Sequence, residues 1–286
     1  RNGPGKVAGM DEAIELIQEN SNIAERGGRI YAKKEREDYQ GKETLMNIIA
    51  PVQEIAELET VYLGVLTTGM TRYNDRKDID YKKVKEQMAQ VVELAGERPV
   101  LYFGARHWHW LDDSALANLA FENGIAAVAT DNGAALRKKQ GSGTIPHALE
   151  NVFAYYYGRE NAVVEATKAF DEVIPKKIPR IALVDYNNKE ITDTLNTAEA
   201  LGQNLKAIRV DTCGENIAEG GVRGDKKYWQ GKGVTVEGVY ALRQAMNKHP
   251  LGKDVGIFLS SGFSNLEKVK AFNEAEKKYG LKLYDG

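Results

Sequence analysis

The segment PRIALVDYNNKEITDTLNTAEALGQNLKAIRVD, residues 179–211, contains the pattern that decides the fold. It holds a short apolar run at 181–184, an amphipathic stretch at 192–201 and a second apolar run at 207–210. These patterns are typical of a strand, a helix and a second strand, and two strands joined through a helix run parallel. The segment therefore predicts a β-α-β unit, with Asp185 and Asp211 directly after its two strands.

The same alternation extends through the C-terminal two thirds of the chain. Apolar runs predict strands at 100–103, 125–129, 181–184, 207–210, 255–259 and 281–284. Amphipathic stretches predict helices at 114–123, 147–157, 161–173, 192–201, 236–248 and 265–279. Six strands separated by helices favour a (β/α) barrel, and a doubly wound parallel sheet stays open because one sequence does not reveal strand order.

The N-terminal third has a different pattern of predicted helices and strands. It predicts helices at 11–19, 56–68 and 81–94, and two strands at 29–33 and 44–49 that need further elements to complete a sheet. We expect an α/β protein in three parts, which are a partial N-terminal α/β sandwich domain at 1–58, a helical connection at 59–96 and an irregular (β/α) barrel domain at 97–286. Because the chain starts at Arg1 and stops at Gly286 just after a predicted strand, we expect both domains to be truncated.

Composition excludes several classes of protein. Hydrophobic residues make up 42% of the 286 residues, which is enough for a sizeable core, and a net charge of −2 argues against a nucleic-acid surface. No run approaches the roughly 18 apolar residues of a membrane helix, and the first six residues, 1–6, carry no apolar signal core, so neither membrane insertion nor secretion is expected. A single cysteine, Cys213, excludes an intramolecular disulfide and fits a cytoplasmic protein.

Polar side chains follow the predicted strands at their carboxyl ends, where parallel α/β folds gather ligand groups. Arginine and histidine suit phosphate or carboxylate oxygens, aspartate suits Mg²⁺ or sugar hydroxyls, and a turn before a helix offers amide groups to an anion. The candidates in chain order are Arg106, His147, Asp185, Arg209, Asp211, Ser261 and Gly262.

Other interpretations remain open for these residues. Asp185 and Asp211 could cap the helices that follow them, Arg106 could be a solvated charge, and His147 could cap a helix. His107 and His109 share one face of a strand and could bind a metal in a barrel hydrolase, although such a site needs further histidines and the chain has four in all.

Four ordered motifs carry a resemblance to a known family. They are Phe103-Gly104-Ala105-Arg106, Gly143-Thr144-Ile145-Pro146-His147-Ala148-Leu149, Ile208-Arg209-Val210-Asp211-Thr212 and Ser260-Ser261-Gly262-Phe263. Together with the helical segment Glu59-Thr60-Val61-Tyr62-Leu63-Gly64, they resemble nicotinate phosphoribosyltransferases of the archaeal type. These enzymes share the type II phosphoribosyltransferase fold with the quinolinate and nicotinamide enzymes.

The resemblance implies phosphoribosyl transfer from phosphoribosyl pyrophosphate to nicotinate, giving nicotinate mononucleotide and pyrophosphate in NAD biosynthesis. Phe103 would stack on the pyridine ring, and Arg106 would contact the substrate carboxylate or the pyrophosphate. The remaining implied roles are pyrophosphate contact for His147 with Thr144 in the same motif, contact with base and phosphate for Arg209, ribose hydroxyls or Mg²⁺ for Asp211, the ribose pocket for Asp185, and the 5-phosphate for Ser261 and Gly262.

Other implications concern cofactors and assembly. The resemblance implies Mg²⁺, ATP as an activator in coupled relatives, where the histidine matching His147 is phosphorylated, and a homodimer or higher oligomer with shared active sites. Quinolinate and nicotinamide are the alternative substrates within the class. The family's N-terminal tyrosine segment and the Gly-Val-Gly loop expected after Gly286 are not in the sequence, so a binding protein without activity is a further alternative.

Overall fold

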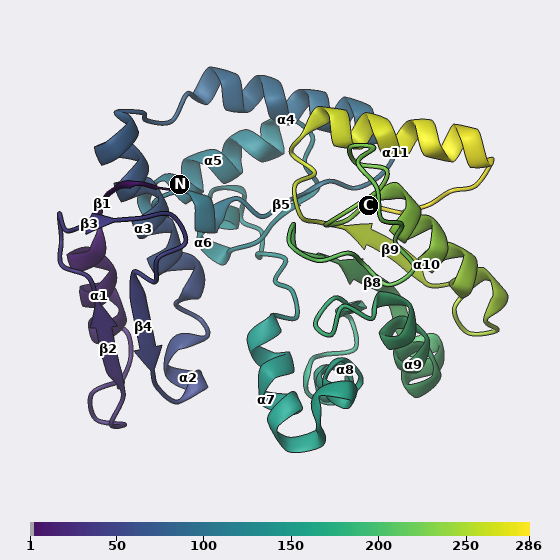
Figure 1. The fold of residues 1–286 in the computed structure, drawn as a ribbon, viewed down its shortest axis with the longest axis horizontal. Helices are drawn as coiled ribbons and strands as arrows, with labels where there is room; N and C mark the ends of the chain where they lie inside the picture. Colours follow the sequence, from purple (N-terminus) through teal and green to yellow (C-terminus); the bar gives the residue numbers. More distant parts are fainter. Residues whose placement is uncertain (1–2) are drawn as a thin grey trace. The chain divides into compact units, whose positions relative to one another are not determined.

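The computed structural model describes residues 3–286 and separates into two compact units (Figure 1). The first unit holds the chain up to Ala89 together with Leu101–Gly143, and the second holds Gln90–Val100 together with Thr144–Gly286. The division falls inside one helix, α4 (Tyr81–Ala95). The boundaries at 58 and 96 expected from the sequence stay a prediction, and each unit is described by itself below.

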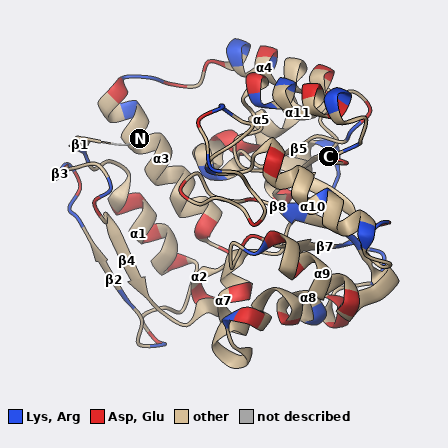
Figure 2. Ribbon diagram, turned by 45° about the vertical axis from the view of Figure 1, so that its right-hand side comes forward, with Lys and Arg blue, Asp and Glu red and all other residues tan. Residues whose placement is uncertain are grey.

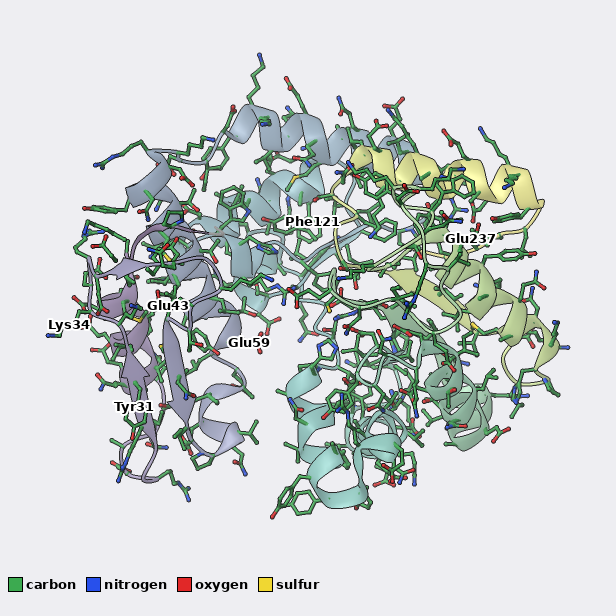
Figure 3. All side chains as sticks on the ribbon, in the orientation of Figure 1. Tyr31, Lys34, Glu43, Glu59, Phe121 and Glu237 are labelled. Carbon is green, nitrogen blue, oxygen red and sulfur yellow. The ribbon has the colours of Figure 1, made fainter. Side chains whose placement is uncertain are left out.

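The first unit begins with short antiparallel strand pairs beside helices. β1 pairs with β3, and β2 pairs with β4 with Arg29 opposite Ile49. The bounds are β1 (Gly5–Lys6), α1 (Met10–Glu19), β2 (Arg29–Ala32), β3 (Asp38–Tyr39), β4 (Met46–Ile49), α2 (Val52–Ile55) and α3 (Glu59–Asp75). The core between α1 and α3 includes Met10 and Val65. Tyr31, labelled in Figure 3, is 53% exposed on β2, so this strand buries little of its side-chain surface.

The rest of the first unit contains the first predicted parallel pair. β5 (Leu101–Tyr102) pairs in parallel with β6 (Ala127–Val128), joined through α5 (Trp110–Glu122). The remaining elements are the 3-10 helix η1 (Ala105–His107), α6 (Asp131–Ala134) and the 3-10 helix η2 (Ala135–Arg137). The side chain of Thr130 accepts a bond from Gly133 at the start of α6 and donates a 2.5 Å bond to the buried Asp113.

The second unit contains a three-stranded parallel sheet in the order β7-β8-β9. Its strands are β7 (Arg180–Leu183), β8 (Leu205–Val210) and β9 (Gly256–Leu259). Its helices are α7 (His147–Tyr157), η3 (Arg159–Asn161), α8 (Ala162–Val173), α9 (Glu190–Leu201), η4 (Gly202–Asn204), α10 (Val236–Lys248) and α11 (Leu266–Tyr279). The β-α-β unit predicted for residues 179–211 is therefore confirmed as β7-α9-β8.

The barrel is not confirmed, because the described sheets are small and open. The parallel strands of residues 3–286 form a pair and a trio, and neither closes on itself. The strand predicted at 281–284 is wrong, since this stretch is irregular and hydrogen bonding alongside β9 begins only at its end. The amide of Asp285 donates to Ile257, and Leu259 donates to Gly286. Residue 283 is instead held by the carboxylate of Glu276, 2.7 Å from the Leu283 amide.

The core of the second unit lies between the sheet and its helices. Ile208 and Ile257 of the sheet pack with Val239 and Leu242 of α10 and with Phe272 of α11, and all five are at most 2% exposed. Burying aliphatic and aromatic side chains of this size contributes about 1.5–3 kcal/mol each. This core fixes the strands whose carboxyl ends carry Asp185 and Asp211.

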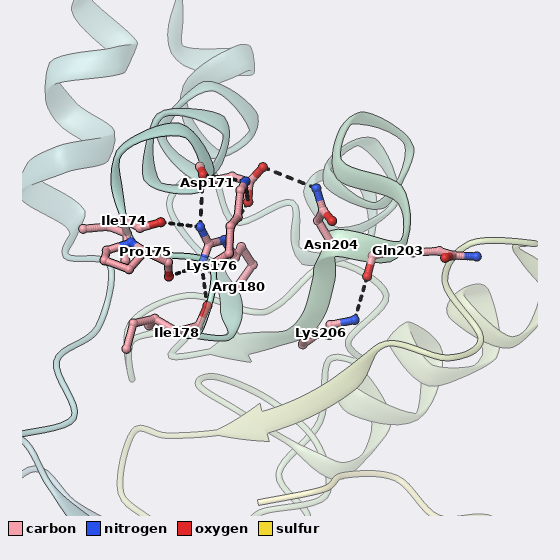
Figure 4. Close-up of polar contacts among 9 residues, drawn as sticks. All are labelled: Asp171, Ile174, Pro175, Lys176, Ile178, Arg180, Gln203, Asn204 and Lys206. Atoms are coloured by element: carbon pink, nitrogen blue, oxygen red, sulfur yellow. Dashed lines mark hydrogen bonds and ion pairs between the residues drawn. The ribbon is translucent and has the colours of Figure 1, made fainter.

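A buried arginine fixes the amino end of β7 (Figure 4). Arg180 is 3% exposed, and its Nε donates a 2.6 Å bond to Oδ1 of Asp171. Its terminal nitrogens donate to the carbonyl oxygens of Asp171, Ile174, Pro175 and Ile178. These five bonds use all five N–H groups of the guanidinium. A buried positive charge is therefore tolerated here. The start of the strand is therefore tied to the end of α8.

Charges of both signs lie on α4, where Lys82, Lys83 and Lys85 precede Glu86 and Glu93 (Figure 2). In residues 3–286, no helix is both long enough and apolar enough to cross a membrane.

Candidate functional site

The candidate site lies at the carboxyl edge of the sheet in the second unit. The Val184 amide donates to the carbonyl of Arg209, and the Ser260 amide donates to that of Val210. These bonds extend the strand pairing beyond β7 and β9 and bring Asp185, Asp211 and Ser260 to one edge. These three positions therefore lie together at the carboxyl edge, where the sequence placed its strand-end polar residues.

Arg209 and Asp211 form an ion pair on one face of β8. Residues two apart on a strand share a face, and Nη2 of Arg209 lies 3.1 Å from Oδ2 of Asp211. The hydroxyl of Ser260 donates a 2.7 Å bond to the other carboxylate oxygen, Oδ1. Both side chains are about five-sixths buried, so the pair is held in one geometry and keeps some access to solvent.

A histidine contacts the next strand end. Nε2 of His147, the first residue of α7, lies 3.3 Å from Oδ2 of Asp185. The Asp185 side chain is 7% exposed, and its other oxygen, Oδ1, is buried without a hydrogen-bond partner in residues 3–286. Helix capping is excluded for Asp185 because α9 begins five residues later, after Lys189. Capping is likewise excluded for His147, since the residue before α7 is Pro146 and no side chain caps it.

A buried acid lies one helical turn beyond His147. Glu150 is fully buried, and neither carboxyl oxygen has a hydrogen-bond partner among the described residues. Burial, with the negative charge of Asp185 beside it, raises the pKa of Glu150 to about 9, and Arg209 opposes the shift. Glu150 is therefore a neutral carboxylic acid at pH 7. It adds no negative charge to the site at that pH.

A turn and a lysine follow β9. Ser261 and Gly262 both have left-handed backbone conformations, with φ of 67° and 84°, which glycine adopts without strain. The ammonium of Lys268, in the first turn of α11, donates a 2.7 Å bond to the carbonyl of Ser261. Burial lowers the pKa of Lys268 to about 8, while Asp211 opposes the shift. The turn that the sequence predicts to bind an anion is therefore in contact with the ammonium of Lys268.

A second buried acid braces the segment after β8. Glu190, the first residue of α9, accepts a 2.6 Å bond from the Thr212 hydroxyl and a 2.7 Å bond from the Glu219 amide. Burial raises the pKa of Glu190, and these two bonds oppose the rise. The Glu219 carboxylate in turn accepts bonds from the amide and hydroxyl of Thr192. Residue 212, next to Asp211, is therefore fixed to the neighbouring crossover.

Three further residues predicted for the site lie elsewhere in the structure. Thr144 is exposed in the segment that leads into α7. Phe103 and Arg106 belong to the first unit, where Phe103 directly follows β5 and is half-buried, and Arg106 is exposed in η1. Their proposed roles rest on the motif resemblance.

The alternative of a histidine metal site gains no support. Nε2 of His109 lies 2.8 Å from Glu12, and its Nδ1 accepts a bond from Leu111 as the cap of α5. Both ring nitrogens are occupied, so His109 has no lone pair left for a metal. Within residues 3–286, no three histidine, cysteine, aspartate or glutamate side chains group as a metal site would.

Sequence reasoning missed Glu150, Glu190 and Lys268. Each lies in the first turn of a helix, where an acidic or basic residue is expected to be solvated. A signal was present for Glu150, because residues three apart on a helix are neighbours and His147 was already a candidate.

Several solved structures have a fold similar to that of this chain. Nicotinate-nucleotide pyrophosphorylase from Pyrococcus furiosus aligns at a TM-score of 0.55 and 26% identity, over 95% of this chain and 59% of that one. Nicotinate phosphoribosyltransferase from Porphyromonas gingivalis aligns at 0.59 and 16% identity, over 87% and 58% of the two chains. A putative nicotinate phosphoribosyltransferase from Saccharomyces cerevisiae aligns at 0.58 and 16% identity, over 95% and 67%.

These likenesses define a class of fold. The mixed α/β chain matches structures with the phosphoribosyltransferase fold, and it spans about three fifths of the length of the first two. No protein-family profile matches the sequence, and no curated protein matches it. At 26% identity to the Pyrococcus protein, the substrate stays a matter for proposal.

Proposed function

We propose that this chain carries the catalytic machinery of a phosphoribosyltransferase that transfers the phosphoribosyl group of phosphoribosyl pyrophosphate to nicotinate. One observation carries the proposal, which is that two pairs, Arg209 with Asp211 and His147 with Asp185, lie at the carboxyl edge of one parallel sheet. The likeness to nicotinate phosphoribosyltransferase structures supports the choice of chemistry.

The reaction breaks the bond between the anomeric carbon and pyrophosphate and forms a bond from that carbon to the pyridine nitrogen. Positive charge develops on the ribosyl group as pyrophosphate leaves. Carboxylates at Asp185 and Asp211 would stabilise that charge, and the guanidinium of Arg209 and a ring N–H of His147 would donate hydrogen bonds to the leaving pyrophosphate. Holding the two substrates together supplies much of the remaining rate enhancement, so no protein nucleophile is required.

Two motif residues of the first unit carry the proposed contacts to the pyridine. Phe103 is proposed to stack on the ring, and Arg106 is proposed to contact the carboxylate of nicotinate, for which a planar guanidinium is suited. Quinolinate and nicotinamide are the alternative substrates. Quinolinate would require a second cation for its second carboxylate.

Mg²⁺ is proposed as an ion that arrives with phosphoribosyl pyrophosphate. The described residues do not make a magnesium site of their own, because no three histidine, cysteine, aspartate or glutamate side chains group together, and each oxygen of Asp211 already accepts one hydrogen bond. Mg²⁺ commonly keeps several waters and binds through one or two carboxylates plus substrate phosphates. ATP activation through His147 and a homodimer with shared sites are also proposed.

A direct assay tests the function. The chain is incubated with phosphoribosyl pyrophosphate, Mg²⁺ and nicotinate, quinolinate or nicotinamide in turn, with and without ATP, and mononucleotide formation is measured by chromatography. The expected result is nicotinate mononucleotide, and its loss in an Asp211→Ala variant that still folds. Asp254→Asn, an exposed residue of the same unit, is the control. Absence of product with every pyridine, on a folded chain, would contradict the proposal and favour a binding protein.

A ligand-binding measurement accompanies the assay. A ligand that binds only the folded state raises the melting temperature. Phosphoribosyl pyrophosphate with Mg²⁺ should raise it, and the preferred pyridine should raise it further. Sedimentation velocity on the same sample measures the oligomeric state.

A further inference from the structure

The further inference concerns Glu150, a buried acid that the proposed chemistry does not use. Its side chain is fully buried in the first turn of α7, and neither carboxyl oxygen has a hydrogen-bond partner among the described residues. A buried carboxyl group gives up its hydrogen bonds to water, which is costly unless a protein group replaces them. The burial of Glu150 therefore calls for a partner close at hand in the protein.

Two hydrogen bonds hold this part of α7 against the residues that follow β7. Nε2 of His147 lies 3.3 Å from Oδ2 of Asp185, and the hydroxyl of Tyr186 donates a 2.7 Å bond to Oδ1 of Asn151. Residues 147, 150 and 151 are neighbours on one face of a helix, because they are three and four positions apart. The two bonds therefore flank Glu150 and hold it beside Asp185.

Asp185 has the matching need for a donor. Its Oδ1 is buried without a hydrogen-bond partner in the described part of the chain, while its Oδ2 contacts His147. Two ionised carboxylates only accept hydrogen bonds, so side by side they leave their oxygens unpaired and repel each other. One proton between them supplies the donor, removes the repulsion and makes a charge-assisted bond. Glu150 and Asp185 are therefore complementary when they hold one proton together.

The charges around Glu150 favour this state. Burial and the negative charge of Asp185 raise the pKa of Glu150 to about 9, Asp193 on α9 adds to the rise, and Arg209 on β8 opposes it. The buried face of α8, which packs against α7, consists of uncharged residues, and none of the three residues of η3 is buried. At neutral pH the proton therefore belongs on Glu150, and the negative charge belongs on Asp185.

We propose that Glu150 is a positioning residue, whose carboxyl O–H donates a hydrogen bond to Oδ1 of Asp185 and so fixes the carboxylate that contacts His147. Each carboxylate oxygen can accept two hydrogen bonds, so Asp185 keeps acceptor sites for a ligand hydroxyl. The consequence for catalysis rests on the proposed function, because it concerns the ribosyl group of that reaction. The hydrogen bond between the two acids does not depend on the proposed function.

Steady-state kinetics of mononucleotide formation test the positioning role. Glu150→Met removes the donor and fills the space, whereas Glu150→Gln puts an N–H donor in place of the O–H. We expect kcat of Glu150→Met to fall about tenfold or more with both KM values within about threefold, because a misplaced Asp185 acts on the reacting group. Glu150→Gln should recover most of that loss. The control Glu160→Met changes an exposed acid of η3 and should leave kcat unchanged.

Two kinetic results would overturn the proposal. Equal losses of kcat in Glu150→Met and Glu150→Gln would mean that the packing of residue 150 matters and its donor does not. A wild-type kcat in Glu150→Met would mean that Asp185 needs no donor at this position.

Infrared spectroscopy follows the proton on the folded protein without turnover. The difference between the spectra of wild type and Glu150→Gln isolates the carboxyl band of Glu150, which should be that of a protonated acid at pH 7 and disappear around its pKa of about 9. In an Asp185→Asn background the negative charge of the acceptor is gone, so the band should disappear below about pH 8. An unchanged midpoint there would mean that burial alone holds the proton, which overturns the proposal.

The two kinds of measurement let the two proposals fail separately. A chain that forms no mononucleotide, while its Glu150 band responds to Asp185→Asn, would overturn the proposed function alone. A chain that forms mononucleotide, while its Glu150 band does not respond to Asp185→Asn, would overturn the hydrogen bond between Glu150 and Asp185 alone.

Discussion

Nε2 of His147 lies 3.3 Å from Oδ2 of Asp185, and the second oxygen of that carboxylate is buried without a partner in the described chain. A carboxylate in this position orients the imidazole. The second oxygen of Asp185, Oδ1, remains as a hydrogen-bond acceptor that His147 does not use. The pair is therefore suited to act on a ligand that brings both a negative group, for His147, and a hydroxyl donor, for Asp185.

Replacing this carboxylate tests the pair. Asp185→Asn keeps the size of the side chain and removes its charge, so we expect kcat for mononucleotide formation to fall by about 10²-fold or more. Steady-state rates of wild type and variant measure the effect. An unchanged rate would contradict the role of Asp185.

Glu150 makes stability depend on pH. The folded-state pKa of about 9 is far above the ordinary value of 4.5, so between these values the folded protein holds a proton that the unfolded chain has lost. The free energy of unfolding contributed by this group is therefore fully present below pH 4.5 and falls as pH rises toward 9. Glu150→Gln mimics the neutral acid and removes this dependence.

We expect Glu150→Gln to gain stability relative to wild type on going from pH 5 to pH 8, by about 1 kcal/mol or more. Urea unfolding at the two pH values measures the difference, and titrations of other groups cancel in the comparison. Glu274→Gln, at an exposed position of α11, should show no such gain. Equal stability differences at both pH values would mean that Glu150 is ionised in the folded protein.

Arg180 is expected to matter for stability and Lys176 is not, although both contact Asp171. Removing one member of a buried ion pair leaves the other uncompensated, so Arg180→Met should lower the free energy of unfolding by about 3–5 kcal/mol. Lys176→Met removes a 68%-exposed partner and should cost less than about 1 kcal/mol. Chemical denaturation compares the two. Similar losses would indicate that Arg180 acts through packing alone.

Phe103 is expected to affect one substrate selectively. Phe103→Ala removes a ring proposed to stack on the pyridine, so the KM for nicotinate should rise about tenfold, while that for phosphoribosyl pyrophosphate should change little. Steady-state kinetics with each substrate varied in turn measure the two constants. If both rise together, Phe103 supports the fold of its loop and does not contact the pyridine.

The sequence predicted the repeating units of this fold better than their assembly. The β-α-β unit at 179–211 has strong local periodicity, and the structure has it as β7-α9-β8. Closure into a barrel depends on pairing between strands far apart in the chain, which local periodicity does not encode. The stretch at 281–284 has the apolar composition of a strand, but the carboxylate of Glu276 binds the Leu283 amide.

The candidate site was predictable where polar side chains stand at the end of a strand. Asp185, Arg209 and Asp211 stand at strand ends, and the structure brings them to one edge through the pairing of β7 with β8. Glu150 and Lys268 were not predictable, because their burial comes from tertiary packing and a charged residue in a first helical turn is ordinarily solvated.

The brace formed by Glu190 fixes the first part of the long connection from β8 to α10. Its carboxylate holds Thr212 and Glu219, so the eight positions from 212 to 219 have a fixed span, and shortening or lengthening them would pull on Asp211. The second part is tied back to the first, because the Gly233 amide donates to the carbonyl of Asn216, and Trp229 and Val234 are buried in the core. The length of the whole connection is therefore part of what positions Asp211, and insertions or deletions anywhere along it should disturb the carboxyl-edge chemistry.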